Sequence, residues 1–178
     1  MKKIGLFYAP ANGNVEKIAK KIAEKIGSEN VDLKLITKDS TTDELLGYDK
    51  LIFGISTVGR DAWNTTYTKI GWDFFLPEIE KIDFTGKTVA LYGLGNQYIY
   101  PQHFVDSMGK LAKILQTKGA KIVGEVSNNG YDFYTSSEAL LPDYATFIGL
   151  PIDEDNEEDQ TETRLTEWLI KIKPLMGL

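Results

Sequence analysis

Residues 3–26, KIGLFYAPANGNVEKIAKKIAEKI, carry the clearest structural pattern in this chain. The stretch begins with a short apolar run and continues through small, turn-forming residues from Ala9 to Asn14. From Val15 to Ile26, apolar residues then recur at helical spacing. This succession predicts a strand, a loop and an amphipathic helix, which together make the first half of a strand–helix–strand unit.

The same alternation continues along the chain. Residues 51–55 are wholly apolar, which is typical of a strand in a parallel sheet covered by helices on both faces. The pattern Thr41-x-x-Glu44 predicts a capping box at the start of a short helix, and Gly119 predicts the end of a longer one. We expect strands at residues 3–8, 31–36, 51–55, 88–92 and 121–126, and a last amphipathic helix with Leu165, Trp168, Leu169 and Ile172 on its inner face.

Strands that alternate with helices predict an α/β fold in which right-handed crossovers cover both faces of a parallel sheet. We expect a doubly wound, five-stranded parallel sheet of order 2-1-3-4-5. Residues 127–145 are polar and residues 146–150 again resemble a strand, so we expect an insertion that splits the fifth strand. No repeat or linker divides the chain, and we expect a single domain over residues 1–178.

The composition excludes several classes of function. With 20 basic and 26 acidic residues the net charge is −6, which argues against nucleic-acid binding. The chain has no cysteine, so thiol catalysis and thiolate metal sites are excluded and redox chemistry requires a bound cofactor. Neither a signal peptide nor an apolar run of membrane-spanning length is found, and we expect a cytoplasmic location.

Charge is distributed unevenly along the chain. Residues 153–162 form an acidic run, whereas Lys17, Lys20, Lys21 and Lys25 lie on the first helix. The acidic run is either a solvated face or a patch that orients a basic partner.

In doubly wound sheets, ligands bind beside the carboxyl ends of the strands, where the strand order reverses. The loop of residues 10–15 follows the first strand and opens a helix, so its amides can converge on an anion such as a phosphate. It matches neither a Walker A loop nor a dinucleotide fingerprint, and an ordinary turn is the alternative.

Two further loops at this edge carry hydroxyl groups, glycines and aromatic rings. Residues 56–59, STVG, follow the third strand and lead toward Trp63 and Tyr67. Residues 93–100, GLGNQYIY, follow the fourth strand, where glycines allow a ligand to approach closely and tyrosines can present a ring face. Together the three loops predict a ligand that is anionic at one end and aromatic at the other.

With these motifs the chain resembles the flavodoxin family, in particular its long-chain members, whose fifth strand is interrupted. Residues 4–19 are similar to the family's first strand, phosphate loop and helix, and residues 93–97, GLGNQ, resemble its Gly-x-Gly-Asp-Gln motif. Similarity extends to F-x-D-x-M-G at residues 104–109, GYDF at 130–133 and FIGLPIDED at 147–155.

The resemblance implies FMN as cofactor and one-electron transfer as function, so the chain would be a low-potential carrier and not an enzyme. It also implies redox partner proteins, a reductase that donates electrons and an enzyme that accepts them, which we expect to dock by electrostatics on a monomer. The cofactor-binding residues that it implies are Pro10, Ala11, Asn12, Gly13, Asn14 and Val15 at the phosphate, Asp132 near the ribityl chain, and Ser56, Thr57, Val58, Gly59, Gly93, Leu94, Gly95, Asn96, Tyr98 and a stacked Tyr100 beside the isoalloxazine.

At four positions the chain lacks a hydroxyl group or a carboxylate of the family pattern. Pro10, Asn12 and Val15 stand where relatives have hydroxyl residues, so backbone amides must bind more of the phosphate. At about 1 kcal/mol per lost hydrogen bond, FMN affinity would fall roughly tens- to hundredfold. Asn96 replaces an aspartate and removes a negative charge near the flavin.

The aromatic residues and the histidine leave alternatives open. Val58 stands where many relatives have a tryptophan on the inner flavin face, and Trp63 or Tyr67 can fold back to replace it. Trp63 is alternatively an anchor buried in the core, and we expect Trp72 to pack at the start of a helix. His103, the single histidine, is either a solvent-facing residue at a helix start or a flavin neighbour.

Three other functions compete with the carrier. A flavin-dependent NAD(P)H:quinone reductase shares the fold, but it needs a nicotinamide site and the chain has no separate dinucleotide fingerprint. A phosphoacceptor receiver domain needs acids at the ends of the first and third strands, where Ala9-Pro10 and Ser56-Thr57 stand. The third competitor is a flavodoxin-like module with weakened or lost FMN binding.

Overall fold

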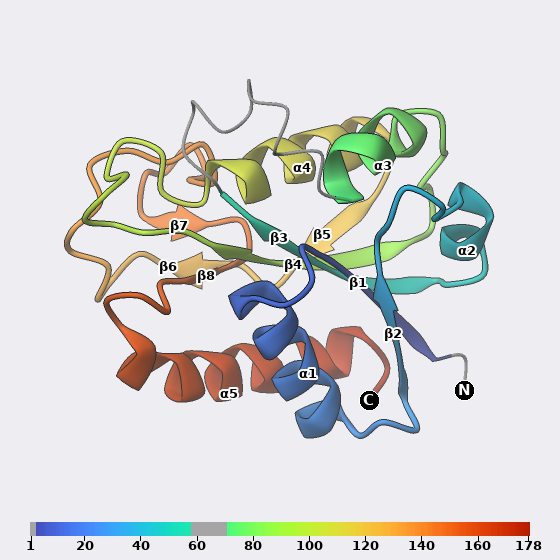
Figure 1. Ribbon diagram of the computed structural model, residues 1–178, viewed down its shortest axis with the longest axis horizontal. Coiled ribbons are helices and arrows are strands. Elements are labelled where there is room, and N and C mark those ends of the chain that lie inside the picture. The colour runs from blue at the N-terminus through green and yellow to red at the C-terminus, as the bar shows by residue number, and fades with distance from the viewer. Residues whose placement is uncertain (1–2, 58–70) are drawn as a thin grey trace.

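The computed structural model describes residues 3–57 and 71–178. Its centre is a parallel sheet of order β2-β1-β3-β4-β5, with β8 also paired to β4, which confirms the expected doubly wound α/β fold (Figure 1). In the described residues, no helix has the length and apolarity needed to cross a membrane. The elements are β1 (Ile4–Ala9), α1 (Asn14–Ile26), β2 (Val31–Leu35), α2 (Thr42–Leu46), β3 (Lys50–Ser56), α3 (Gly71–Ile79), β4 (Thr88–Leu94), α4 (Asp106–Thr117), β5 (Lys121–Val123), β6 (Val126–Ser127), β7 (Thr146–Phe147), β8 (Leu150–Ile152) and α5 (Glu158–Leu175).

Each face of the sheet buries its own apolar core. α1 and α5 cover one face, and α3 and α4 cover the other (Figure 1). Successive side chains of a strand point to opposite faces, so Leu6 joins the core with α1 and α5, whereas Phe7 joins the core with α3 and α4. Both side chains are at most 1% exposed. Burial on both faces holds the strands in register and thereby fixes where their loops begin.

The fifth strand is split, as the sequence predicts. One edge of β4 pairs first with β5 and then, from Tyr92 to Leu94, with β8. The expected strand at residues 121–126 is too long, because the backbone at Gly124 adopts φ +91°, a left-handed conformation that favours glycine and ends the pairing. Val126 instead pairs with Phe147 in the small antiparallel β6-β7 sheet, so the expected strand at residues 146–150 divides between β7 and β8. Residues 124–149 are called the insertion below.

α5 packs with the apolar face that its periodicity predicts. Leu165, Trp168, Leu169 and Ile172 are all buried. The indole Nε1 of Trp168 also donates a hydrogen bond to the carbonyl oxygen of Gly124 at 2.8 Å. The helix is therefore anchored at the point where the insertion leaves the sheet.

The expected capping box at the start of α2 is wrong. Thr41 occupies the N-cap position, but its side chain makes no capping hydrogen bond. The Glu44 amide donates to the Thr41 carbonyl oxygen instead, and the Glu44 carboxylate lies 3.6 Å from Lys34 Nζ on β2. The neighbouring cation offers the carboxylate a charged partner that the capping motif lacks.

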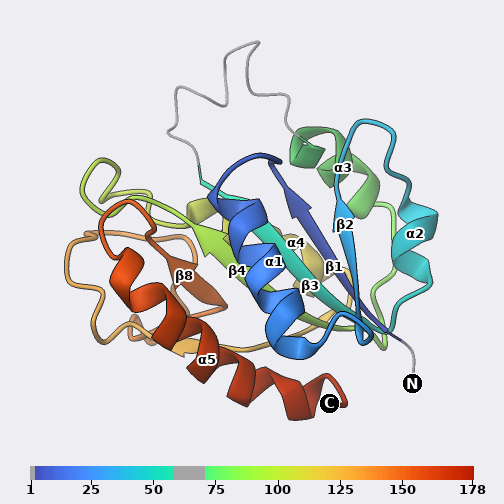
Figure 2. The same cartoon turned by 60° about the horizontal axis from the view of Figure 1, so that its bottom comes forward.

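Ion pairs join α1 to the acidic run at the start of α5, and the two helices lie side by side (Figure 2). Lys17 Nζ lies 2.7 Å from carboxylate oxygens of both Glu154 and Glu158, and this pairing raises the Lys17 pKa. Lys21 and Lys25 both pair with Glu162. Three carboxylates of the run are thus neutralised by lysines of α1, while Glu158 and Glu162 stay exposed to solvent. The run is a solvated face that also joins two helices, and its docking to a basic partner stays a prediction.

These pairs predict a pH dependence of stability. A hydrogen bond from Lys25 lowers the pKa of Glu162 below its usual 4.5, so its stabilising contribution is complete above that value and is lost as the pH falls through the lowered folded pKa. We expect Glu162→Gln to flatten the fall in free energy of unfolding between about pH 5 and pH 3, measured by urea denaturation. Glu24→Gln is the control, because Glu24 is an exposed acid of α1, beside Lys25, that makes no ion pair in the described residues. Parallel pH profiles for wild type and Glu162→Gln would contradict this assignment.

Candidate functional site

The carboxyl ends of β1, β3 and β4 meet at one cavity of about 350 Å³. Figure 2 shows α1 starting beside the end of β1 at this edge of the sheet. A second cavity, of about 850 Å³, lies between α5 and the insertion. Of these two cavities we take the smaller as the functional site, because it combines a helix N-terminus with the loops at the switch point of the sheet. It is lined by Pro10, Asn14, Val15, Ser56, Thr57, Leu94, Gly95, Asn96, Ile99, Tyr100, Glu154 and Asp155.

The first loop presents backbone amides at the start of α1. Gly13 is the N-cap residue, and the amides that open a helix have no intrahelical partner. Asn12 has φ +58°, a left-handed conformation that asparagine tolerates better than most residues. The amide dipoles and the positive end of α1 make this loop attractive to an anion.

The carboxylate of Glu16 is itself bound to this loop. Glu16 Oε2 accepts a hydrogen bond from the Asn12 amide at 2.7 Å, and Glu16 Oε1 lies 2.7 Å from Lys20 Nζ. The hydrogen bond from Lys20, together with that from Asn12, lowers the Glu16 pKa. Sequence reasoning missed Glu16, whose only signal was an acid in the first turn of a helix.

Val15 contributes to this loop through its backbone. Its side chain is 2% exposed and packs in the core with α1, while its carbonyl oxygen accepts a hydrogen bond from the Tyr92 hydroxyl at 2.9 Å. Tyr92 is completely buried on β4, and burial raises its pKa. The start of α1 is thereby fixed to the strand whose loop forms the opposite wall of the cavity.

The loop after β3 is described only as far as Thr57. The Thr57 amide donates to the Leu94 carbonyl oxygen at 2.8 Å, and its Oγ1 accepts a hydrogen bond from the Ser107 amide at 3.0 Å. The hydroxyl oxygen thus holds the first turn of α4 beside the cavity. Trp72 is buried near the start of α3, as expected, and its Nε1 donates to the Gly54 carbonyl oxygen at 2.8 Å. Four positions named above, Val58, Gly59, Trp63 and Tyr67, lie outside the described residues.

Asn96 builds the turn of the loop after β4. Its Oδ1 accepts the amides of Tyr98 at 3.1 Å and Ile99 at 2.8 Å, and its Nδ2 donates to Asp155 Oδ2 at 3.0 Å. The side chain therefore shapes the cavity wall and links it to the residues after β8. Asp155 belongs to the cavity although the sequence marked it only as part of an acidic run.

The glycines of this loop serve close packing. Gly93 lies within β4, not in the loop, and a Cβ there would stand 2.7 Å from Met108 Cβ of α4. A Cβ at Gly95 would come within 2.9 Å of the Phe104 ring and the Val105 amide. Both glycines let the segment that opens α4 approach β4, which positions the loop from behind.

Seven predicted residues of the described chain lie outside the cavity lining: Ala11, Asn12 and Gly13 of the first loop, Gly93 of β4, and Tyr98, His103 and Asp132. Tyr98 is 54% exposed and stacks on Phe133 of the insertion with ring centroids 4.5 Å apart. His103 Nδ1 lies 2.9 Å from Asp106 Oδ2, which anchors the imidazole at the start of α4. Asp132 is an exposed residue of the insertion. Of the predicted set in the described residues, the structure gathers Pro10, Asn14, Val15, Ser56, Thr57, Leu94, Gly95, Asn96 and Tyr100 around the cavity.

Comparisons with known proteins agree with this geometry. The family model described as Flavodoxin matches residues 6–168. The chain is 41% identical over 175 residues to a flavodoxin of Haemophilus influenzae, covering 98% of this chain and 96% of that protein. It is 39% identical over 174 residues to flavodoxin 1 of Escherichia coli K12, covering 98% and 94%.

A solved structure supports the same assignment over the whole fold. The crystal structure of Fusobacterium nucleatum flavodoxin bound to flavin mononucleotide is 30% identical, with a TM-score of 0.84 over 98% of this chain and 99% of that chain. The chain belongs to the flavodoxin family.

Proposed function

We propose that this chain is a low-potential one-electron carrier that binds FMN non-covalently in the cavity at the ends of β1, β3 and β4. The observation that carries the proposal is the full-length match to a flavodoxin solved with flavin mononucleotide. Bound FMN supplies the one-electron chemistry that a chain without cysteine cannot supply itself. Family membership favours an electron-transfer protein over the quinone reductase alternative.

The residues at the cavity fit this cofactor. The amides at the start of α1 suit its phosphate. Apart from the neighbours of Gly13 in the chain, no heavy atom of the described residues lies within 4 Å of a Cβ position there, which leaves the loop open on that side. On the opposite wall, Tyr100 is 40% exposed and presents an aromatic ring to a planar group. We propose that residues 10–15 bind the phosphate and that Asp132 lies near the ribityl chain. Ser56, Thr57, Val58, Gly59, Trp63 and residues 93–100 then enclose the flavin ring, with His103 at its periphery.

A carrier exchanges electrons with redox partner proteins. We propose that a reductase donates electrons to this chain, that an enzyme accepts them, and that both dock by electrostatics near the cavity. The net charge of −6 and the carboxylate of Asp155 at the cavity favour basic partner surfaces. Ile99, 67% exposed beside the same cavity, offers an apolar contact at the site of electron exchange. We further propose that the carrier acts as a monomer of one domain, residues 1–178, in the cytoplasm.

A charge placed at Gly13 tests the phosphate site and with it the function. We expect the protein to bind FMN, seen as quenching of flavin fluorescence, and Gly13→Asp to bind FMN about tenfold more weakly than Gly13→Asn, because only the aspartate repels the phosphate. Riboflavin, which lacks the phosphate, should bind both variants equally. Absence of FMN binding to the wild-type chain would refute the proposed function, and equal FMN affinities of the two variants would refute the phosphate site.

Removing the charge of Glu16 should have the opposite effect. Its carboxylate holds the Asn12 amide and repels a phosphate nearby, so we expect Glu16→Gln to raise FMN affinity about threefold. Glu24→Gln, on the same helix, is the control and should leave the affinity unchanged. A weaker affinity in Glu16→Gln would show instead that the carboxylate supports the loop in its binding conformation.

The charge at position 96 should set the potential of the bound flavin. Asn96→Asp places a negative charge beside the ring as it becomes anionic on reduction, so we expect a midpoint potential more negative by roughly 20–60 mV. Asn30→Asp, just before β2 at the amino edge of the sheet, is the matched control. Redox titration that finds no difference, or the opposite order, would contradict this role of Asn96.

A further inference from the structure

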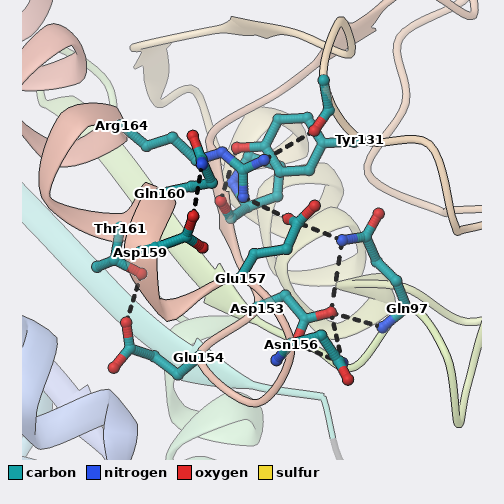
Figure 3. Close-up of polar contacts among 12 residues, drawn as sticks. Gln97, Tyr131, Asp153, Glu154, Asn156, Glu157, Asp159, Gln160, Thr161 and Arg164 are labelled. Carbon is teal, nitrogen blue, oxygen red and sulfur yellow. Dashed lines mark hydrogen bonds and ion pairs between the residues drawn. The ribbon is translucent and has the colours of Figure 1, made fainter.

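Arg164 of α5 binds the insertion on one side and Glu157 on the other (Figure 3). Its Nη2 donates to the carbonyl oxygen of Gly130 at 2.8 Å, and its guanidinium carbon lies 3.9 Å from the centroid of the Tyr131 ring. Its Nη1 donates to Glu157 Oε2 at 2.6 Å. One side chain therefore fixes both a turn of the insertion and a carboxylate at the start of α5.

Glu157 continues these contacts to the loop after β4. Oε2 of Glu157 also accepts a hydrogen bond from the side-chain Nε2 of Gln97 at 2.9 Å. The backbone amide of Gln97 donates to Asp153 Oδ2 at 2.9 Å (Figure 3). Gln97 follows Asn96, which lines the proposed cofactor cavity. The series of contacts from Gly130 thus ends at the wall of that cavity.

These polar groups are shielded from water. The side chains of Arg164 and Glu157 are 13% and 12% exposed, and Gln97 and Asp153 are completely buried. Where water cannot screen a charge, removal of one partner leaves the other uncompensated. The position of the Glu157 carboxylate therefore depends on Arg164.

The side-chain amide of Gln97 is free to rotate once the Glu157 carboxylate is no longer held by Arg164. Its Nε2 faces two carboxylates, those of Glu157 and Asp153, whereas its buried Oε1 has no hydrogen-bond partner in the described residues. A buried acceptor without a donor is costly, so only the two carboxylates favour the present orientation.

We propose that Arg164 is a positioning residue for the loop after β4, because it holds Glu157 against Gln97 and braces that contact against the insertion. The proposal rests on the proposed function, in which this loop borders FMN. Arg164 does not line the cofactor cavity, so it acts only through Glu157 and Gln97. The insertion that splits the fifth strand then supports the cofactor loop from behind.

Arg164→Met tests this role, with Lys171→Met as the matched control. Lys171 lies on the same helix and also binds the insertion, through the Glu125 carbonyl oxygen at 2.9 Å, but it does not contact Glu157 or Gln97. In the FMN-free protein we expect amide hydrogen exchange at residues 97–99 to be at least about tenfold faster in Arg164→Met and unchanged in Lys171→Met. In the FMN complex we expect faster FMN release and a shifted midpoint potential in Arg164→Met alone.

The outcomes separate this proposal from the proposed function. Equal exchange at residues 97–99 in wild type and Arg164→Met, or equal acceleration in both variants, overturns the positioning role whether or not FMN binds. Unchanged FMN release and potential in spite of faster exchange overturn the link from Arg164 to the cofactor. Failure of the wild-type chain to bind FMN refutes the proposed function and leaves the exchange result standing.

A milder variant keeps the test decisive if Arg164→Met does not fold. Arg164→Gln retains a donor but is too short to reach Glu157 and Gly130 together, so residues 97–99 should still exchange faster than in Lys171→Met. Exchange rates equal to those of wild type in Arg164→Gln would overturn the proposal.

Discussion

The site depends on β4 being held along its whole length. β3 pairs with all seven of its residues, and β5 and then β8 pair with its other edge. Its Tyr92 ring lies over Gly54 of β3, where a Cβ would approach to 2.1 Å, and its hydroxyl reaches the Val15 carbonyl oxygen at the start of α1. One buried strand thereby fixes both the loop at the start of α1 and the loop after β4. The cavity between these two loops is formed by the packed core itself.

Acidic residues serve two purposes after β8. Glu154, Glu158 and Glu162 pair with lysines of α1 and join two helices on one face of the sheet. Asp153 and Asp155 instead accept hydrogen bonds from Gln97 and Asn96 and so hold the loop after β4. The acidic run of residues 153–162 resembles a uniform charged surface in the sequence. In the structure, some of its carboxylates join two helices and others hold a loop of the cavity, because consecutive residues of a turn point in different directions.

Sequence patterns predicted the sheet order, the split strand and the apolar face of α5, since hydrophobic periodicity reports directly on which side chains are buried. The sequence patterns did not predict which partner a side chain contacts when several lie within reach. Glu44 pairs with Lys34 and not within a capping box, and Tyr98 stacks on Phe133, a residue 35 positions away in sequence that no local pattern connects to it. Gly93 and Leu94 were expected in a loop but lie in β4, where the missing side chain of Gly93 makes room for Met108.

By itself, the amino-acid sequence determined the α/β class, the turn between the first strand and helix at residues 10–15, and the resemblance to an FMN-binding family, because these depend on local periodicity and on the order of motifs. Only the tertiary structure decided that Glu16 occupies the Asn12 amide, that Asn96 is tied to Asp155 and that Arg164 reaches Gln97 through Glu157. Such contacts join residues from different loops, and their geometry exists only after the two cores have packed the sheet between its helices.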